Sequence, residues 1–198
     1  SLRRAANAAW AEMCDNGWVR EVPRGALRHV TAQGAVPKAG GRVRLVQDGS
    51  DWPRGQPRFC MIRPEHFFAR VRRGEAVAVV DVRRAFMQVP VHSTVWPDLG
   101  LVWTTAGAAA RFYHLVVLPT GGAASPVILQ ATMAELLRIL RQFSLFGAGP
   151  LETAVFMDDA AVQGQTTAAT AAALLLGHEV AGWLGLQLTK IQLSCRVC

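Results

Sequence analysis

The chain has 198 residues, enough for one domain or two small lobes, with a hydrophobic fraction of 51% and a mean hydropathy of +0.21. It has no uninterrupted run of about 18 apolar residues and opens without a signal-peptide pattern, which argues against a membrane-spanning helix and a secretory leader. The formal net charge of +7 lies in residues 1–75, which hold 14 Lys and Arg against 7 Asp and Glu, whereas residues 76–198 hold 7 of each.

The apolar content and the charge distribution indicate a chain that binds other molecules. The high apolar content predicts either a large core or an apolar surface that a partner covers. A basic half attracts phosphates, and the alternatives are a solvated basic surface and an arginine-rich composition. Because the chain starts at Ser1 rather than at Met, we expect a piece of a longer polypeptide or a processed chain.

The N-terminal part of the chain predicts a helix followed by short strands. Residues 1–16 interleave Ala and Trp10 with charged side chains, and Gly17 ends this helix. Residues 18–60 are rich in Gly, Pro and Arg and contain three short β-like runs, WVREV, LRHV and VRLV. Residues 64–73 have the periodicity of a second helix.

The central part predicts a buried strand and a long helix. Residues 76–82 form a continuous apolar run, typical of a strand buried on both faces, and residues 86–117 predict further strands. Ser125 and Pro126 mark the start of a helix that runs to about residue 143. We expect this helix to bury five apolar side chains, Ile128, Met133, Leu136, Leu137 and Leu140.

The most informative stretch is AVFMDDAAVQG, residues 154–164. Apolar runs flank Asp158 and Asp159, which predicts a hairpin with both carboxylates at its turn, and Asp81 ends the strand at 76–82. Like charges held close repel, and a divalent cation that bridges them relieves the repulsion. Two acidic strand ends that meet in a sheet therefore predict a magnesium site able to support phosphoryl transfer.

The C-terminal part predicts a helix over residues 167–183 and a last strand in LQLTKIQL. The order strand, helix, hairpin, helix, strand predicts an α+β layer with helices on one face of an antiparallel sheet. Cys195 and Cys198 form a C-x-x-C, but Cys14 and Cys60 are not a matching pair, so we expect no zinc site. This cysteine usage fits a reducing intracellular compartment.

Three motifs in this order resemble the palm motifs of reverse transcriptases. DVRRAF, residues 81–86, resembles the Asp-x-x-x-Ala-Phe/Tyr motif of that family, and LPTGGAASP, residues 118–126, resembles its Leu-Pro-x-Gly-x-x-x-Ser-Pro motif. FMDD, residues 156–159, resembles its Tyr-x-Asp-Asp box, with Phe156 in place of the tyrosine. The run VPVHSTVWPDLGLVW resembles the DIRS-like and hepadnavirus-like branches, and the resemblance spans about residues 17–193.

The resemblance implies a polymerase palm with a small basic fingers lobe. We expect a fingers-like region over residues 1–75 and a palm-like region with the acidic metal site over residues 76–198. The sequence stops soon after the palm motifs, so we expect no thumb. From these 198 residues alone we expect salt-sensitive RNA binding and at most weak, distributive synthesis.

The implied activity is that of an RNA-directed DNA polymerase, acting on an RNA template, a DNA or RNA primer and deoxynucleoside triphosphates. The resemblance assigns catalysis and metal binding to Asp81, Asp158 and Asp159, with Mg²⁺ as the cofactor and Mn²⁺ as an alternative. Taken alone, Asp81 is better explained as an acid that ends a strand or lies in a turn, and it is the other two motifs that favour a metal ligand.

The resemblance also implies a nucleotide-binding set, formed by Lys38, Arg44, Phe86, Gly121 and Lys190. Lys38 and Arg44 lie in a run similar to the fingers hairpin whose basic residues clamp the triphosphate, although surface charge is an alternative. Phe86 is expected under the sugar, where it favours deoxynucleotides, or else in the core. Gly121 lets a backbone approach closely, and Lys190 resembles the lysine that protonates the pyrophosphate.

A second class of function fits the same residues. A domesticated palm could serve as an RNA-binding or structural subunit of a ribonucleoprotein. The intact acids favour the polymerase, while the missing thumb, the start at Ser1 and the apolar composition favour the subunit. An RNA polymerase with a similar palm is disfavoured by Phe86. Further partners would be other protein subunits or the missing thumb and RNase H parts, and we expect no membrane.

Overall fold

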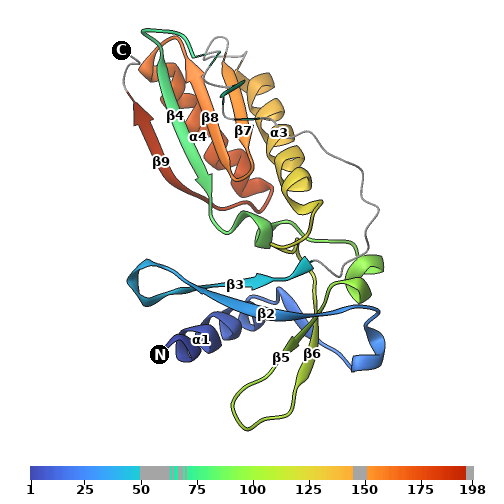
Figure 1. The fold of residues 1–198 in the computed structure, drawn as a ribbon. Helices are drawn as coiled ribbons and strands as arrows, with labels where there is room; N and C mark the ends of the chain where they lie inside the picture. The colour runs from blue at the N-terminus through green and yellow to red at the C-terminus, as the bar shows by residue number, and fades with distance from the viewer. Residues whose placement is uncertain (50–62, 64, 67–68, 70, 145–150, 195–198) are drawn as a thin grey trace. The chain divides into compact units, whose positions relative to one another are not determined.

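Two compact units make up the chain in the computed structural model, which describes residues 1–49, 63, 65–66, 69, 71–144 and 151–194. Each unit is assembled from two separate segments, as the colours of Figure 1 show. The segments are Ser1–Pro57 with Val89–Ser125 in unit 1, and Arg58–Gln88 with Pro126–Cys198 in unit 2. The predicted α+β class is confirmed. The predicted division into fingers-like residues 1–75 and palm-like residues 76–198 stays a prediction.

In its described residues, unit 1 combines one α-helix with a five-stranded sheet in the order β1-β6-β5-β2-β3. The helix is α1 (Leu2–Asp15), and the strands are β1 (Val19–Glu21), β2 (Val30–Pro37), β3 (Val43–Gln47), β5 (Gly100–Trp103) and β6 (Arg111–Leu115). Short 3₁₀ turns are η1 (Arg24–Ala26), η2 (Ala39–Gly41) and η5 (Ser93–Asp98). The β2–β5 pair is parallel and the other pairs are antiparallel.

The helix predicted over residues 1–16 is confirmed as α1, and its buried face explains its position. Ala6, Trp10 and Met13 are buried at a helical spacing. Trp10 stacks on Trp103 of β5, with ring centroids 4.7 Å apart and an interplanar angle of 6°. Its edge meets Tyr113 of β6 at 4.9 Å. Helix α1 therefore covers the sheet face that carries Trp103 and Tyr113.

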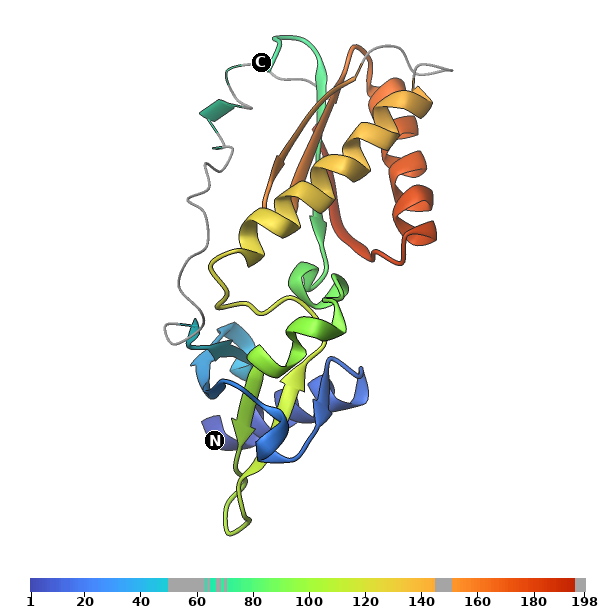
Figure 2. The same ribbon diagram turned by 90° about the vertical axis from the view of Figure 1, so that its right-hand side faces the viewer.

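Unit 2 holds a four-stranded antiparallel sheet in the order β7-β8-β4-β9. Its strands are β4 (Ala76–Val82), β7 (Glu152–Phe156), β8 (Asp159–Gly164) and β9 (Leu188–Ser194), with helices α3 (Ser125–Ser144) and α4 (Thr167–Trp183) and the 3₁₀ turn η4 (Ala85–Gln88). Helix α4 packs on the three strands β4, β8 and β9. Helices α3 and α4 lie side by side (Figure 2), and a Cβ on Gly177 would lie 3.2 Å from Leu140.

The core of unit 2 follows the predicted strand and helices closely. Ala78 and Val80 of β4 pack against Leu174 of α4, so the predicted strand is confirmed. The prediction that both of its faces are buried is wrong, because burial alternates along β4 and Val79 is 38% exposed, as in an antiparallel sheet that packs on the core with one face. A second core prediction is wrong, because Ile128 is 43% exposed and Leu129 is buried instead. The reason is helical phase, since Leu129 shares a face with three other buried residues of α3, Met133, Leu136 and Leu140.

The helix predicted over residues 64–73 lies largely outside the described residues. Within the described part of the chain, no helix has both the length and the apolar character needed to span a membrane.

Candidate active site

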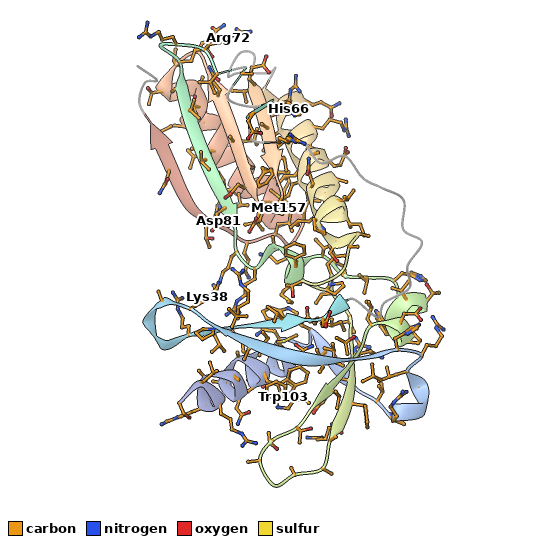
Figure 3. The ribbon with its side chains drawn as sticks, in the orientation of Figure 1. Lys38, His66, Arg72, Asp81, Trp103 and Met157 are labelled. Carbon is orange, nitrogen blue, oxygen red and sulfur yellow. The ribbon has the colours of Figure 1, made fainter. Side chains whose placement is uncertain are left out.

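Two strands of unit 2 bring the predicted acids to one end of the sheet. Asp81 lies near the end of β4, Asp159 begins β8, and the two residues are register partners. The N–H of Val82 donates to the carbonyl of Asp158 at 3.1 Å, which holds the turn residue beside the same strand. The backbones of the three acids that the motifs predicted therefore lie next to one another in space, although Asp81 is far from the other two in the sequence. Figure 3 shows Asp81 and Met157 at the same end of the sheet.

The turn that carries Asp158 is tight and strained. Phe156 and Asp159 are register partners, so Met157 and Asp158 form a two-residue hairpin turn. Met157 has a φ of 55°, in the left-handed region that glycine usually occupies at this place of a hairpin. Holding a methionine there costs about 1–2 kcal/mol, which the flanking strand pairs must offset.

The strand on the other side of β4 contributes to the same place. Thr189 of β9 is the register partner of Asp81, and its hydroxyl donates to the Asp81 carbonyl at 3.3 Å. The β4–β9 register shifts between Val79 and Asp81, and such irregularities re-aim side chains at the ends of strands. Lys190 follows Thr189 in β9, but its side chain lies outside the described part of the structure.

The electrostatics of this strand end suit a divalent cation. Register partners of an antiparallel pair project to the same face with Cβ atoms about 5 Å apart, so Asp81 and Asp159 set two like charges side by side. Asp81 and Asp158 are half-buried and Asp159 is exposed.

The carboxylates at this end of the sheet suit Mg²⁺, although they would not fill all of its coordination positions. Among the described residues, no group of three or more His, Cys, Asp or Glu side chains is placed to hold one metal ion. Mg²⁺ is commonly bound through one or two carboxylates, with waters and substrate phosphates as the remaining ligands. Asp81 on β4, Asp158 in the turn and Asp159 on β8 would supply these carboxylates, with no more than two of them on any one ion.

The segment after β4 carries Phe86 and an unpredicted contact. Phe86 is half-buried in η4. The side-chain amide of Gln88 donates to the carbonyl of Gln187 at 3.3 Å and accepts the N–H of Gln187 at 2.6 Å. Gln88 thus ties the loop after Asp81 to the segment that leads into β9. No local sequence signal reveals this contact, because its partners are 99 positions apart.

The other three predicted nucleotide-binding residues belong to unit 1. Lys38 and Arg44 are both exposed on the β2–β3 hairpin, Lys38 beside η2 and Arg44 opposite Val36. Neither has an ion pair with a carboxylate that the structure describes. Their charges are therefore available to a phosphate, and their role stays a prediction.

Gly121 is explained by packing inside unit 1. A Cβ on Gly121 would lie 2.1 Å from the carbonyl oxygen of Gln47, so this position needs glycine whether or not a nucleotide approaches. The buried amide of Gln47 accepts the N–H of Thr120 at 3.0 Å and donates to Gln33 at 3.2 Å. Gln47 thereby fixes the loop of the second motif on β3, and the motif resemblance had not singled it out.

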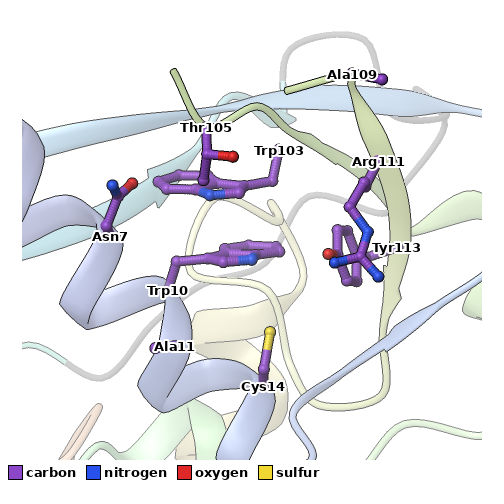
Figure 4. Close-up of a pocket in the computed structure, with 9 residues that line it drawn as sticks. All are labelled: Asn7, Trp10, Ala11, Cys14, Trp103, Thr105, Ala109, Arg111 and Tyr113. Atoms are coloured by element: carbon purple, nitrogen blue, oxygen red, sulfur yellow. The ribbon is translucent and has the colours of Figure 1, made fainter. Parts of the chain in front are cut away.

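A separate aromatic pocket lies against α1 in unit 1 (Figure 4). Its volume is about 280 Å³, and its walls include Trp10, Trp103, Tyr113, Arg111 and Cys14. Arg111 is bound by both oxygens of Glu21, and burial raises the pKa of the Cys14 thiol. A neutralised arginine and a protonated thiol offer no base or nucleophile, so the acid end of unit 2 remains the candidate active site.

Comparison with known proteins agrees with the motifs. A family model described as reverse transcriptase (RNA-dependent DNA polymerase) matches residues 41–194, well over half of the chain. The matched range contains the three acids and every predicted nucleotide-binding residue except Lys38. No curated protein matches the chain.

Proposed function

Because the chain belongs to the reverse transcriptase (RNA-dependent DNA polymerase) family, we propose that it copies RNA into DNA by nucleotidyl transfer at the acid end of unit 2. One observation carries the proposal: Asp81 stands opposite Asp159 on adjacent strands, with Asp158 in the adjoining turn. Placing like charges side by side costs stability, and a site that binds cations and phosphates gives that cost a purpose.

The proposal gives each predicted residue a task. Asp81 and Asp158 would hold two divalent cations, with Asp159 as a supporting acid, and the bound cations would neutralise phosphate charge and make the primer hydroxyl a better nucleophile. Lys38 and Arg44 contact the triphosphate, where the planar fork of Arg44 suits bidentate binding. Phe86 packs under the sugar and excludes a 2′-hydroxyl, and Lys190 protonates the departing pyrophosphate. Gly121 lets its loop lie against Gln47 of β3, and the nucleotide contact that the resemblance implied for it stays a prediction.

The test is primer extension by the full chain on an RNA template with Mg²⁺ and deoxynucleotides. Asp158→Asn should abolish extension while circular dichroism and melting temperature stay unchanged, because the amide keeps the shape and loses the charge. Asp15→Asn is the matched control, since this exposed acid is the last residue of α1 in the other unit and should leave extension unaltered. Equal activity of the Asp158 variant and the wild type would refute the assignment.

The same assay separates the second class of function. A wild-type chain that binds RNA in a salt-dependent manner, yet extends no primer with Mg²⁺ or Mn²⁺, would favour an RNA-binding or structural subunit of a ribonucleoprotein. The proposed preference for deoxynucleotides is read in parallel from the ratio of ribonucleotide to deoxynucleotide incorporation, which Phe86→Ala should raise.

A further inference from the structure

The sheet of unit 1 has a second face that the motifs do not explain. Register partners lie on the same face of a sheet, so Arg20 of β1, His114 and Phe112 of β6, and Val102 of β5 share one face. Helix α1 covers the opposite face, through the stack of Trp10 on Trp103. The turn η5 lies against β6 and adds Trp96 to this second face. The ring centroid of Trp96 is 5.0 Å from that of His114.

Two exposed arginines lie on the aromatic rings of this face. The guanidinium carbon of Arg20 is 5.0 Å from the centroid of Trp96, and that of Arg24 is 5.9 Å from the centroid of Phe112. Arg24 also donates to the carbonyl of Leu27 at 3.0 Å. Contact with a ring restricts where the guanidinium can lie but uses none of its N–H donors, so the charge is held in place and most donors stay open.

Two other arginines of unit 1 show the contrasting arrangement. Both oxygens of Asp98 bind Arg28, and both oxygens of Glu21 bind Arg111, so these two guanidinium forks are already filled and neutralised. Arg111 also lies over a ring, with its guanidinium carbon 6.0 Å from the centroid of Tyr113, so the carboxylate and not the ring contact makes the contrast. Neither Arg20 nor Arg24 has an ion pair with any carboxylate that the structure describes. The unneutralised positive charge of this face is therefore concentrated at Arg20 and Arg24.

We propose that Arg20 and Arg24, on Trp96 and Phe112, form a binding surface for single-stranded nucleic acid, distinct from the acids of unit 2 and from Lys38 and Arg44. An open guanidinium fork matches a phosphate, and the outer plane of a guanidinium accepts a stacked base. Alternating cationic and aromatic groups are the features of sequence-tolerant single-strand surfaces. The choice of nucleic acid over another polyanion rests on the proposed function, whereas the open cationic surface does not.

The experiment measures binding of the full chain to a fluorescently labelled oligo(U) by anisotropy over a series of salt concentrations. The double variant Arg20→Gln with Arg24→Gln should weaken binding at low salt by about 10-fold or more. Two lost phosphate contacts should also reduce the slope of log K against log salt by about 1.4, because each single-strand contact contributes about 0.7. The matched control is Arg28→Gln with Arg111→Gln. It lowers the net charge by the same two units, but at guanidinium groups that carboxylates already occupy, so the affinity for oligo(U) should change less than about 2-fold.

Three outcomes would overturn the surface. The proposal fails if the Arg20→Gln, Arg24→Gln variant binds oligo(U) with wild-type affinity. It also fails if the control variant loses as much affinity, because bulk charge would then explain the binding. Equal, Arg20- and Arg24-dependent binding of poly-glutamate would show a general site for acidic polymers. Arg20→Lys with Arg24→Lys tests the guanidinium itself and should restore the salt slope without restoring the affinity.

Primer extension by the same proteins keeps this inference separate from the proposed polymerase. If the wild type extends primers but the double variant binds oligo(U) normally, the surface is wrong and the polymerase stands. If the wild type extends nothing but binding still depends on Arg20 and Arg24, the polymerase is wrong and the surface stands.

Discussion

The two sheets of this protein place their chemical groups in opposite ways. In unit 2 the acids come from strand ends that short motifs mark, and register sets like charges beside each other at Asp81 and Asp159. In unit 1 distant segments bring together groups that attract, such as Arg28 with Asp98 and Trp10 with Trp103. The comparison teaches that a destabilising arrangement, such as paired like charges, indicates function more strongly than a stabilising one, such as an ion pair or an aromatic stack.

The largest expected effect tests the like charges of unit 2. Asp81→Asn should lower primer extension by about 1,000-fold, because a charge that stabilises the transition state contributes several kcal/mol and each 1.4 kcal/mol is a factor of ten. The free energy of unfolding should change by less than about 1 kcal/mol. Extension rates and urea unfolding of the same preparation measure both quantities. A large loss of stability with activity retained would reverse the contrast between the units.

The next effect tests the attractive packing of unit 1. Trp10 is 5% exposed and contacts two aromatic rings, so Trp10→Ala should lower the free energy of unfolding by about 3–5 kcal/mol. Trp183 at the end of α4 is 76% exposed, so Trp183→Ala should change it by less than about 0.5 kcal/mol. Urea unfolding followed by circular dichroism compares the two variants. Similar losses would show that the stack is not a centre of stability.

Glycine substitutions give a smaller test of the same contrast. Gly121→Ala would press a Cβ against the Gln47 carbonyl at 2.1 Å and should cost about 1–3 kcal/mol. A Cβ on Gly182 of α4 meets nothing within 4 Å, so Gly182→Ala should instead stabilise the chain by up to about 1 kcal/mol. The melting temperatures of the two variants should therefore shift in opposite directions. An unchanged melting temperature in Gly121→Ala would mean that the loop moves freely away from β3.

The smallest effect is a pH dependence that arises in unit 1. Burial, and then the charge of Arg20, lowers the pKa of His114 from its usual 6.5, so the folded chain favours the neutral imidazole. The unfolded chain binds the proton more readily. Stability should therefore be complete above about pH 6.5 and fall as the pH drops through the lowered pKa of the folded state.

His114→Gln should flatten this decline, which we expect to be no more than a few degrees in Tm between pH 7.5 and 5. His178 is exposed on α4 of unit 2, so His178→Gln is the control and should preserve the decline. A decline of unchanged size in the His114 variant would assign the pH dependence to other groups.

Much of the fold could be predicted because its signals are local. The apolar run at 76–82, the helix over 167–183 and the hairpin around Asp158 all lie where periodicity and turn residues placed them. Family membership could also be predicted, because three short motifs in order are a property of the chain itself. The DIRS-like or hepadnavirus-like branch, the metal ligands and the nucleotide contacts stay predictions.

What the sequence could not supply was the pairing of distant segments. Residues 100–115, whose strands were predicted, pair with β1 and β2 of the N-terminal segment, and no local pattern encodes that choice. The contacts of Gln47 with Thr120 and of Gln88 with Gln187 likewise join residues far apart in the chain.

The sequence by itself determined most of the described helices and strands, the order of the acid motifs and the excess of positive charge in the first 75 residues, because periodicity, turn chemistry and composition act over a few neighbouring residues. It did not indicate that the stretch predicted as strands, residues 86–117, begins with the 3₁₀ turns η4 and η5. Only the tertiary structure decided that Asp81 lies opposite Asp159, and that Arg28 and Arg111 are neutralised by carboxylates whereas Arg20 and Arg24 have no ion pair with a described carboxylate. Strand register and side-chain packing depend on which distant surfaces bury each other, and that is a property of the whole fold.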